Sequence, residues 1–240
     1  YVIADESGNE FVWIPVDGVN VKYEKFAGFD SSYKEVSDSE YPEGITAVTE
    51  SNIVNDAGGF YIGRYEAGVP EGQSVIDGTS SSSNTSGIPV SKKGAVVWTN
   101  IDHTNANNNA KAYMNNSEVA SGLMTGKSWD TVCKWLENSG IDINDSRTYG
   151  NYNDSQSPAN IEGYGNKQVA GYSEYWKVKN IYDFAGNILE WTNEVVYDFH
   201  ILRGGYCLVK GSELSVSNRN VNITGEVTVI DGSRLQLYIK

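Results

Sequence analysis

The clearest apolar patterns in this chain are two short runs near its N-terminus. Residues 11–16 read Phe-Val-Trp-Ile-Pro-Val, and residues 59–65 read Gly-Phe-Tyr-Ile-Gly-Arg-Tyr. Short runs rich in β-branched and aromatic residues predict strands. Residues 17–58, between the two runs, are polar and acidic with no sustained period, so we expect a long surface excursion there.

Helical periodicity is confined to two segments. Between a candidate N-cap at Ser128 and a stop at Gly140, apolar residues recur at helical spacing, namely Trp129, Val132, Cys133 and Leu136. This spacing predicts a helix of about three turns. A weaker pattern predicts a second helix over residues 104–114.

Most of the remaining chain favours loops. Residues 77–87 are a low-complexity stretch of Ser, Thr, Asn and Gly, which predicts a mobile loop, and residues 144–171 show no period. No repeat of solenoid length is visible. We therefore expect one α+β domain over residues 1–240, rich in loops, with two main helices and short antiparallel strands.

Composition limits the classes of function. The 240 residues carry 31 acidic and 18 basic side chains, a formal net charge of −13, and 39% of the residues are hydrophobic. The apolar fraction is sufficient for a core, whereas the acidity would repel a phosphate backbone and excludes general nucleic-acid binding. No apolar run has the length of a membrane span, and residues 1–20 lack the pattern of a signal peptide. Because the chain begins at Tyr1, we expect an anchoring segment outside these residues.

The small number of cysteines and histidines also limits the kinds of scaffold and metal site that the chain can form. Cys133 and Cys207 are the only thiols, which excludes a disulfide-dense scaffold, while one disulfide or two free thiols both remain open. His103 and His200 lie far apart in sequence and receive no role. Two histidines exclude any site that needs three imidazole ligands.

The most informative segment is residues 180–192, Asn-Ile-Tyr-Asp-Phe-Ala-Gly-Asn-Ile-Leu-Glu-Trp-Thr, which concentrates turn residues, aromatics and two carboxylates. Asp183 and Glu190 are spaced so that, together with carbonyls of the turn between them, they can ligate a hard cation such as calcium. From the spacing alone, the alternative that both carboxylates cap turns stays open.

This segment, with Arg-Gly-Gly-Tyr-Cys at residues 203–207, resembles the signature of formylglycine-generating-enzyme-like domains of the sulfatase-modifying-factor type. The runs at 11–16 and 59–66, Ile-Pro-Val at 88–90 and the closing run 232–240 follow in that family's order. The resemblance covers essentially the whole chain and implies a C-type-lectin-like fold. It also implies a structural calcium ion held by Asp183, the carbonyls of Gly186 and Ile188, and Glu190.

The resemblance does not extend to the catalytic centres of that family. Formylglycine-generating enzymes bind copper through two nearby cysteines, and no second cysteine follows Cys207. The related sulfoxide synthases hold iron with three histidines, and this chain has two. We therefore expect no catalysis, with Cys133 in the core and Cys207 either a buried small side chain or an inert surface thiol.

One branch that the chain resembles comprises the variable ligand-binding proteins of diversity-generating retroelements in bacteria and phages, in which a rigid scaffold displays randomised C-terminal side chains. The corresponding segment here is residues 206–231. Its candidate contact residues are Tyr206, Cys207, Leu208, Val209, Asn218, Asn220, Asn222, Thr224, Thr228, Ile230 and Asp231. For each of them, a scaffold role remains equally open.

The resemblance implies recognition without chemistry. We expect an extracellular module, on a bacterial cell or a phage particle, that binds a protein or glycan on another cell surface. A fixed surface or pilus-associated adhesin of the same fold remains an alternative, as does a metal-dependent oxidoreductase of the superfamily.

Overall fold

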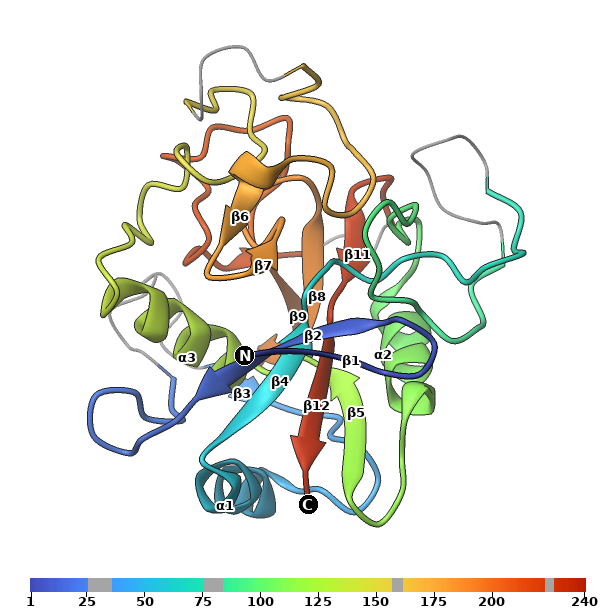
Figure 1. Ribbon diagram of the computed structural model, residues 1–240, viewed down its shortest axis with the longest axis vertical. Helices are drawn as coiled ribbons and strands as arrows, with labels where there is room; N and C mark the ends of the chain where they lie inside the picture. The colour runs from blue at the N-terminus through green and yellow to red at the C-terminus, as the bar shows by residue number, and fades with distance from the viewer. Residues whose placement is uncertain (26–35, 76–83, 157–161, 223–226) are drawn as a thin grey trace.

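The chain folds around a five-stranded antiparallel sheet (Figure 1). The structure, a computed structural model, describes residues 1–25, 36–75, 84–156, 162–222 and 227–240. Across the sheet, the strands are β1 (Val2–Ala4), β2 (Glu10–Pro15), β4 (Gly59–Gly63), β12 (Leu235–Ile239) and β5 (Val119–Leu123). The sheet contains both β1, at the N-terminal end of the chain, and β12, at the C-terminal end, so the two ends of the chain share one sheet.

A second sheet continues from the first. It contains β10 (Asn220–Val221), β9 (Phe199–Arg203), β8 (Leu189–Val196) and β11 (Asp231–Ser233) in that order, with β3 (Val36–Asp38) also paired to β8. Strand β11 runs parallel to β8, and the other pairs are antiparallel. Only Arg234 separates β11 from β12, so this residue lies where the chain passes from one sheet to the other. Two further strands, β6 (Lys177–Val178) and β7 (Ile181–Tyr182), pair with each other.

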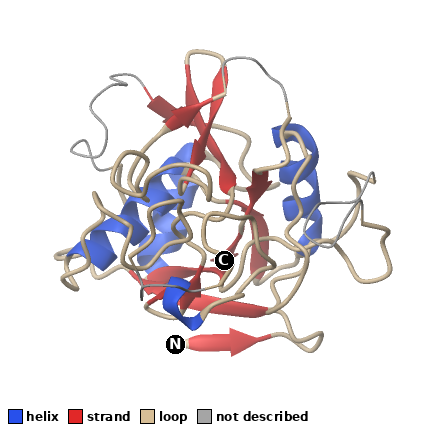
Figure 2. Ribbon diagram, turned by 90° about the horizontal axis from the view of Figure 1, so that it is seen from above, coloured by secondary structure: helices blue, strands red, loops and turns tan. Residues whose placement is uncertain are grey.

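Among the residues that the structure describes, three helices cover the sheets. They are α1 (Ala47–Ala57), α2 (His103–Tyr113) and α3 (Gly126–Glu137), and a 3-10 turn spans Glu174–Trp176. Helices α2 and α3 lie on opposite sides of the molecule (Figure 2). Among the described residues, no helix combines the length and the apolar run that crossing a bilayer requires.

The core forms on both faces of the five-stranded sheet. Val12 and Ile14 of β2 pack into one apolar cluster with Trp129 of α3, whereas Phe11 and Leu237 belong to a second cluster that includes residues of α2. Successive residues of a strand point to opposite faces, so a sheet covered on both faces can bury almost every residue of a strand.

The α+β prediction is confirmed, and both predicted strands and both predicted helices exist. Helix α3 begins earlier than expected because Thr125 is its N-cap, and Ser128 instead completes a capping box with Thr125. The expectation of an unbroken surface excursion over residues 17–58 was wrong, since α1 lies within it, capped by Thr46 and ended by Gly58. Much of the predicted loop at 77–87 falls on residues 76–83, which lie outside the described residues, as do residues 157–161 of the loop at 144–171.

Candidate functional site

Four buried charges anchor the segment that follows β9. Arg203 donates hydrogen bonds to Asp130 of α3 at 2.8 Å and to Glu194 of β8 at 3.0 Å. Arg219 pairs with the same two carboxylates, and its Nε lies 2.9 Å from Glu194. All four side chains are buried. We call these residues the arginine cluster: Asp130, Glu194, Arg203 and Arg219.

The arginine cluster is balanced in charge and holds the backbone as well as side chains. Arg203 also donates to the carbonyls of Ser217 at 3.0 Å and Asn218 at 2.9 Å. Burial opposes ionisation, but the two arginines nevertheless lower the pKa of Glu194. The residues after β9 are therefore tied to α3 and β8 by ionised groups.

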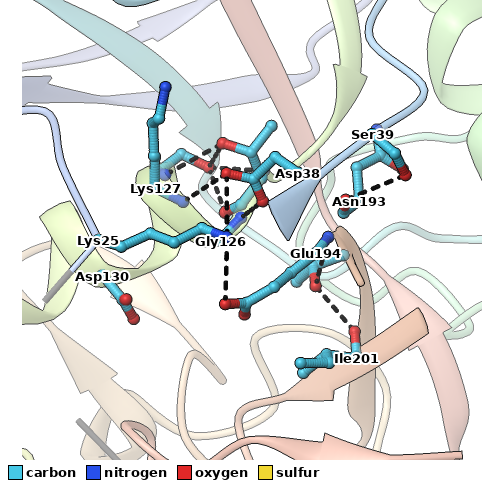
Figure 3. A network of polar contacts seen from close by, with 12 residues as sticks. Lys25, Asp38, Ser39, Gly126, Lys127, Asp130, Asn193, Glu194 and Ile201 are labelled. Atoms are coloured by element: carbon cyan, nitrogen blue, oxygen red, sulfur yellow. Dashed lines mark hydrogen bonds and ion pairs between the residues drawn. The ribbon is translucent and has the colours of Figure 1, made fainter. Parts of the chain in front are cut away.

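A third carboxylate extends this network toward the start of α3. Asp38 accepts a hydrogen bond from the backbone N–H of Gly126 at 2.6 Å, and Lys25 lies 3.8 Å from Asp38 and 3.7 Å from Glu194 (Figure 3). Burial raises the pKa of Asp38 to about 7, although Lys25 acts in the opposite direction. The network therefore caps α3 while it fixes β3 against β8.

A second buried cluster contains more acid than base. Arg234 donates to Glu190 through Nη2 at 2.7 Å and through Nε at 3.1 Å, and its other contacts are the carbonyls of Gly63 and Tyr182. Asp183 and Glu66 lie in the same buried environment. We call these residues the acid cluster: Glu66, Asp183, Glu190 and Arg234.

Two oxygens of the acid cluster accept no hydrogen bond from the described residues. Asp183 accepts from the Gly171 N–H through Oδ2 at 2.6 Å, and Glu66 accepts from Asn187 through Oε2 at 2.6 Å. In the part of the chain that the structure describes, Asp183 Oδ1 and Glu66 Oε1 are buried without a hydrogen bond. Burial raises the pKa of Asp183 to about 7, and burial together with the charges of Asp183 and Glu190 raises the pKa of Glu66 well above its usual range. Buried unpartnered carboxylate oxygens are costly unless a proton or cation compensates them.

The turn between Asp183 and Glu190 depends on its residue types. Asp183, Gly186 and Asn187 all have positive φ, at 52°, 76° and 61°. A Cβ at Gly186 would lie 2.2 Å from the carbonyl oxygen of Asn151, so only glycine fits there. The Asn187 amide donates to Glu66, which ties the turn to the segment that follows β4.

The predicted calcium ligands therefore lie in and beside the acid cluster. The unpartnered Asp183 Oδ1 suits a cation, whereas both oxygens of Glu190 already accept from Arg234. The assignment of Asp183, Gly186, Ile188 and Glu190 stays a prediction.

Sequence reasoning gave no role to Glu66 or Arg234. The available signal was the position of Glu66 at the end of the run 59–66 and of Arg234 at the start of the closing run.

The predicted contact residues differ widely in exposure. Thr228 is exposed, Leu208 is 59% exposed, and several others are partly exposed, namely Tyr206, Val209, Asn218, Asn220, Asn222 and Ile230. The loop that carries Leu208 lies at the end of the molecule opposite α1 and the C-terminus (Figure 1). The neighbouring Val227 and Val229, not among the candidates, are 38% and 54% exposed.

Three of these assignments need revision. Cys207 and Asp231 are 1% and 2% exposed, so they are scaffold residues and not surface contacts. Asn218 accepts from the backbone N–H and hydroxyl of Ser215, which makes its side chain part of a turn. Thr224 lies outside the described residues. Cys133 is buried in the core as predicted, and both cysteines are free thiols.

The two histidines, which the sequence left without a role, meet in space. The rings of His103 and His200 stack with their centroids 3.3 Å apart. Burial and the neighbouring His200 lower the pKa of His103 to about 4, so its imidazole is neutral at pH 7.

Comparison with known proteins identifies the fold. No known protein family and no curated protein sequence matches the chain. The solved structure of PvdO from Pseudomonas aeruginosa aligns over 100% of this chain and 98% of its own, with a TM-score of 0.50 and 12% identity. CarF aligns over 76% of this chain and 87% of its own (TM-score 0.48, 15% identity), and Treponema denticola variable protein 1 over 53% and 50% (TM-score 0.32, 19% identity). The fold is the C-type-lectin-like fold that the sequence motifs imply.

Proposed function

We propose that this chain is a non-catalytic ligand-binding module, of the kind that diversity-generating retroelements vary, displayed on a bacterial cell or phage particle. Its contact surface is the exposed part of residues 206–231, and its ligand is a protein or glycan on another cell. The observation that carries this proposal is the presence of exposed apolar side chains, Leu208 and Val229, on loops whose backbone carbonyls accept hydrogen bonds from side chains elsewhere in the chain.

The loop backbone around these side chains is anchored at several points. Asn153 donates its side-chain amide to the Leu208 carbonyl at 2.8 Å, and Lys167 donates to the Val229 carbonyl at 2.8 Å. At Gly205 the chain takes φ 72°, and a Cβ there would lie 2.2 Å from the Leu214 carbonyl oxygen. Apolar side chains on a pre-organised backbone lose little entropy when they bind, which favours recognition.

The environment of Cys207 supports a role without redox chemistry. Burial raises the pKa of its thiol to about 11, which disfavours the reactive thiolate in the metal-free protein. The only other thiol, Cys133, lies in the core, where burial raises its pKa to about 12.

The proposal includes a structural calcium ion beside the acid cluster. Its support is the acid excess and the open Asp183 Oδ1, with the carbonyls of Gly186 and Ile188 in the same turn. Glu190 would share its oxygens between the ion and Arg234. Such an ion would neutralise buried charge and fix the turn that hydrogen-bonds to Gly204 and Cys207, at the start of the contact surface.

Binding of fluorescently labelled protein to a panel of intact bacterial cells, read by flow cytometry, tests the contact surface. The face variant is Leu208→Ser with Val229→Ser. The matched control is Val19→Ser with Val48→Ser, two exposed valines outside the C-terminal segment. We expect the face variant to lose at least about tenfold in apparent affinity, because exposed apolar anchors dominate such interfaces, and the control to bind as wild type does. Equal binding by both variants would contradict the proposal.

The retroelement itself is a separate part of the proposal. A template repeat and a reverse-transcriptase gene beside the coding sequence would support it. Their absence from the genomic neighbourhood would favour the fixed adhesin of the same fold.

A further inference from the structure

Glu40, His103 and His200 come together beside the C-terminal segment. Glu40 precedes α1, His103 opens α2 and His200 lies in β9, and one ligand atom from each lies within 4.8 Å of the other two. A pocket of about 270 Å³ adjoins the two histidines, with Asn222 and Val227 in its wall. Three distant parts of the chain thus present two imidazoles and one carboxylate at a single place.

The hydrogen bonds of Asn193 determine which nitrogen of His103 is available. The Asn193 amide group donates to the Glu40 carbonyl at 3.2 Å and to Asn107 Oδ1 at 3.3 Å, so its oxygen is the atom that faces His103 Nε2 at 2.9 Å. His103 Nε2 therefore carries the proton and donates it to that oxygen, which leaves the lone pair on Nδ1.

That lone pair accepts no hydrogen bond from any residue that the structure describes. His103 is 6% exposed, and within the described residues its Nδ1 is buried without a hydrogen-bond partner. The same is true of His200 Nδ1, while His200 Nε2 lies 3.4 Å from Glu40 Oε1. Two adjacent buried nitrogens without partners are an uncompensated cost of desolvation, and a ligand that accepts their lone pairs would remove it.

Supporting contacts orient the carboxylate as well. Asn107 donates to Glu40 Oε2 at 2.7 Å, which leaves Oε1 directed at the His200 ring. Glu40 adopts φ 55°, a left-handed conformation that is costly for this residue type and that the Asn193 bond to its carbonyl holds in place. Hydrogen bonds of this kind behind each ligand are typical of protein metal centres.

We propose that Glu40, His103 and His200 bind one divalent transition-metal ion of borderline softness, of which Zn²⁺ is the type. Two imidazoles and one carboxylate form a set that such ions favour, and three protein ligands leave a coordination position for water. The site is independent of the ligand-binding function proposed above.

Ligation requires a local rearrangement. The imidazole planes are 10° from parallel, so their in-plane lone pairs cannot meet at one ion until one ring turns. His200 is the ring that can turn, because its side chain is 22% exposed and borders the pocket. Bonds of about 2.0–2.2 Å to a shared ion then draw the three side chains closer together.

Calorimetric titration of EDTA-treated, dialysed full-length protein with Zn²⁺ tests the site, and the visible absorption of bound Co²⁺ reports tetrahedral coordination. We expect one Zn²⁺ per chain in the wild type. His200→Asn and Glu40→Gln should each weaken binding at least about tenfold, and Asn107→Ala should weaken it about tenfold through the loss of its support for Glu40. The matched control, Glu43→Gln, removes an exposed carboxylate from the same segment and should leave binding unchanged.

Two results would overturn the proposal. One is wild-type affinity for Zn²⁺ in both His200→Asn and Glu40→Gln, which would place the ion elsewhere in the protein. The other is the lack of any Zn²⁺ or Co²⁺ binding by the wild type. Neither result bears on cell binding by the contact surface, so the two proposals fail separately.

Discussion

The arginine cluster and the acid cluster are built alike and differ in charge balance. Each takes one carboxylate from β8, Glu194 or Glu190, and pairs it with arginine from the C-terminal part of the chain. The arginine cluster matches two carboxylates with two arginines, whereas the acid cluster sets three carboxylates against Arg234. The first is therefore complete as a structural tie, and the second needs protons or a cation to compensate its charge.

The largest expected effect comes from breaking the arginine cluster. Arg203→Met would leave the two carboxylates of Asp130 and Glu194 buried with only Arg219 between them. We expect the free energy of unfolding, measured by urea denaturation, to fall by about 3–5 kcal/mol. In the control, Arg147→Met breaks the partly exposed pair with Asp145 and should cost less than about 1 kcal/mol. Similar losses in both variants would show that the arginine cluster is not a structural tie.

Calcium should stabilise the folded protein through the acid cluster and not through the arginine cluster. At about 100 times its Kd, an ion that binds only the folded state stabilises it by about 2.7 kcal/mol. We expect Ca²⁺ to raise the melting temperature of the wild type and of Glu40→Gln, but not of Asp183→Asn. An equal rise in Asp183→Asn would remove this residue from the ligand set.

Without calcium, the acid cluster should make stability depend on pH. The pKa of Asp183 is raised in the folded state to about 7, so the folded protein retains a proton that the unfolded chain releases. Asp183 therefore stabilises the fold below about pH 4 and loses that contribution as the pH rises to about 7.

In EDTA, Asp183→Asn should flatten this decline and be more stable than the wild type at about pH 8, by about 1–2 kcal/mol. Asparagine can still accept the Gly171 N–H. Urea denaturation between about pH 5 and pH 8 measures the effect, with the exposed Asp56→Asn as control. A parallel pH dependence in the wild type and Asp183→Asn would contradict it.

Substitutions in the contact surface should change the free energy of unfolding least of all. Leu208→Ser with Val229→Ser removes side chains that are more than half exposed, so we expect a change in unfolding free energy below about 1 kcal/mol. The same urea experiment measures it. A loss comparable to that of Arg203→Met would mean that these side chains belong to the scaffold.

Local patterns in the sequence predict much of the fold and little of the charge network. The apolar spacing of Trp129 and Leu136 was sufficient for α3, but α1 was missed because it is largely exposed and lacks an apolar stripe. Its signals were the cap at Thr46 and the stop at Gly58. The Arg203–Asp130 pair joins residues 73 positions apart, which no local pattern can reveal.

The candidate sites also differ in how far the sequence could predict them. Asp183 and Glu190 were found because one turn carries both, and their motif resembles a known signature. The meeting of His103 and His200 depends on how α2 packs against β8, the strand that pairs with β9, so their separation in sequence concealed it. The exposure of individual side chains within residues 206–231 could not be predicted from the sequence either. Cys207 and Leu208 are neighbours in sequence, yet they are 1% and 59% exposed.

We infer that a fixed scaffold carries a replaceable contact surface. A scan of all substitutions over residues 203–234, with protease-resistant display as the readout of folding, tests it most directly. We expect broad tolerance at Leu208, Thr228 and Val229, and little tolerance at Arg203, Gly205, Arg219 and Arg234. Equal intolerance at the exposed and the buried positions would contradict the claim, because the segment would then be scaffold throughout.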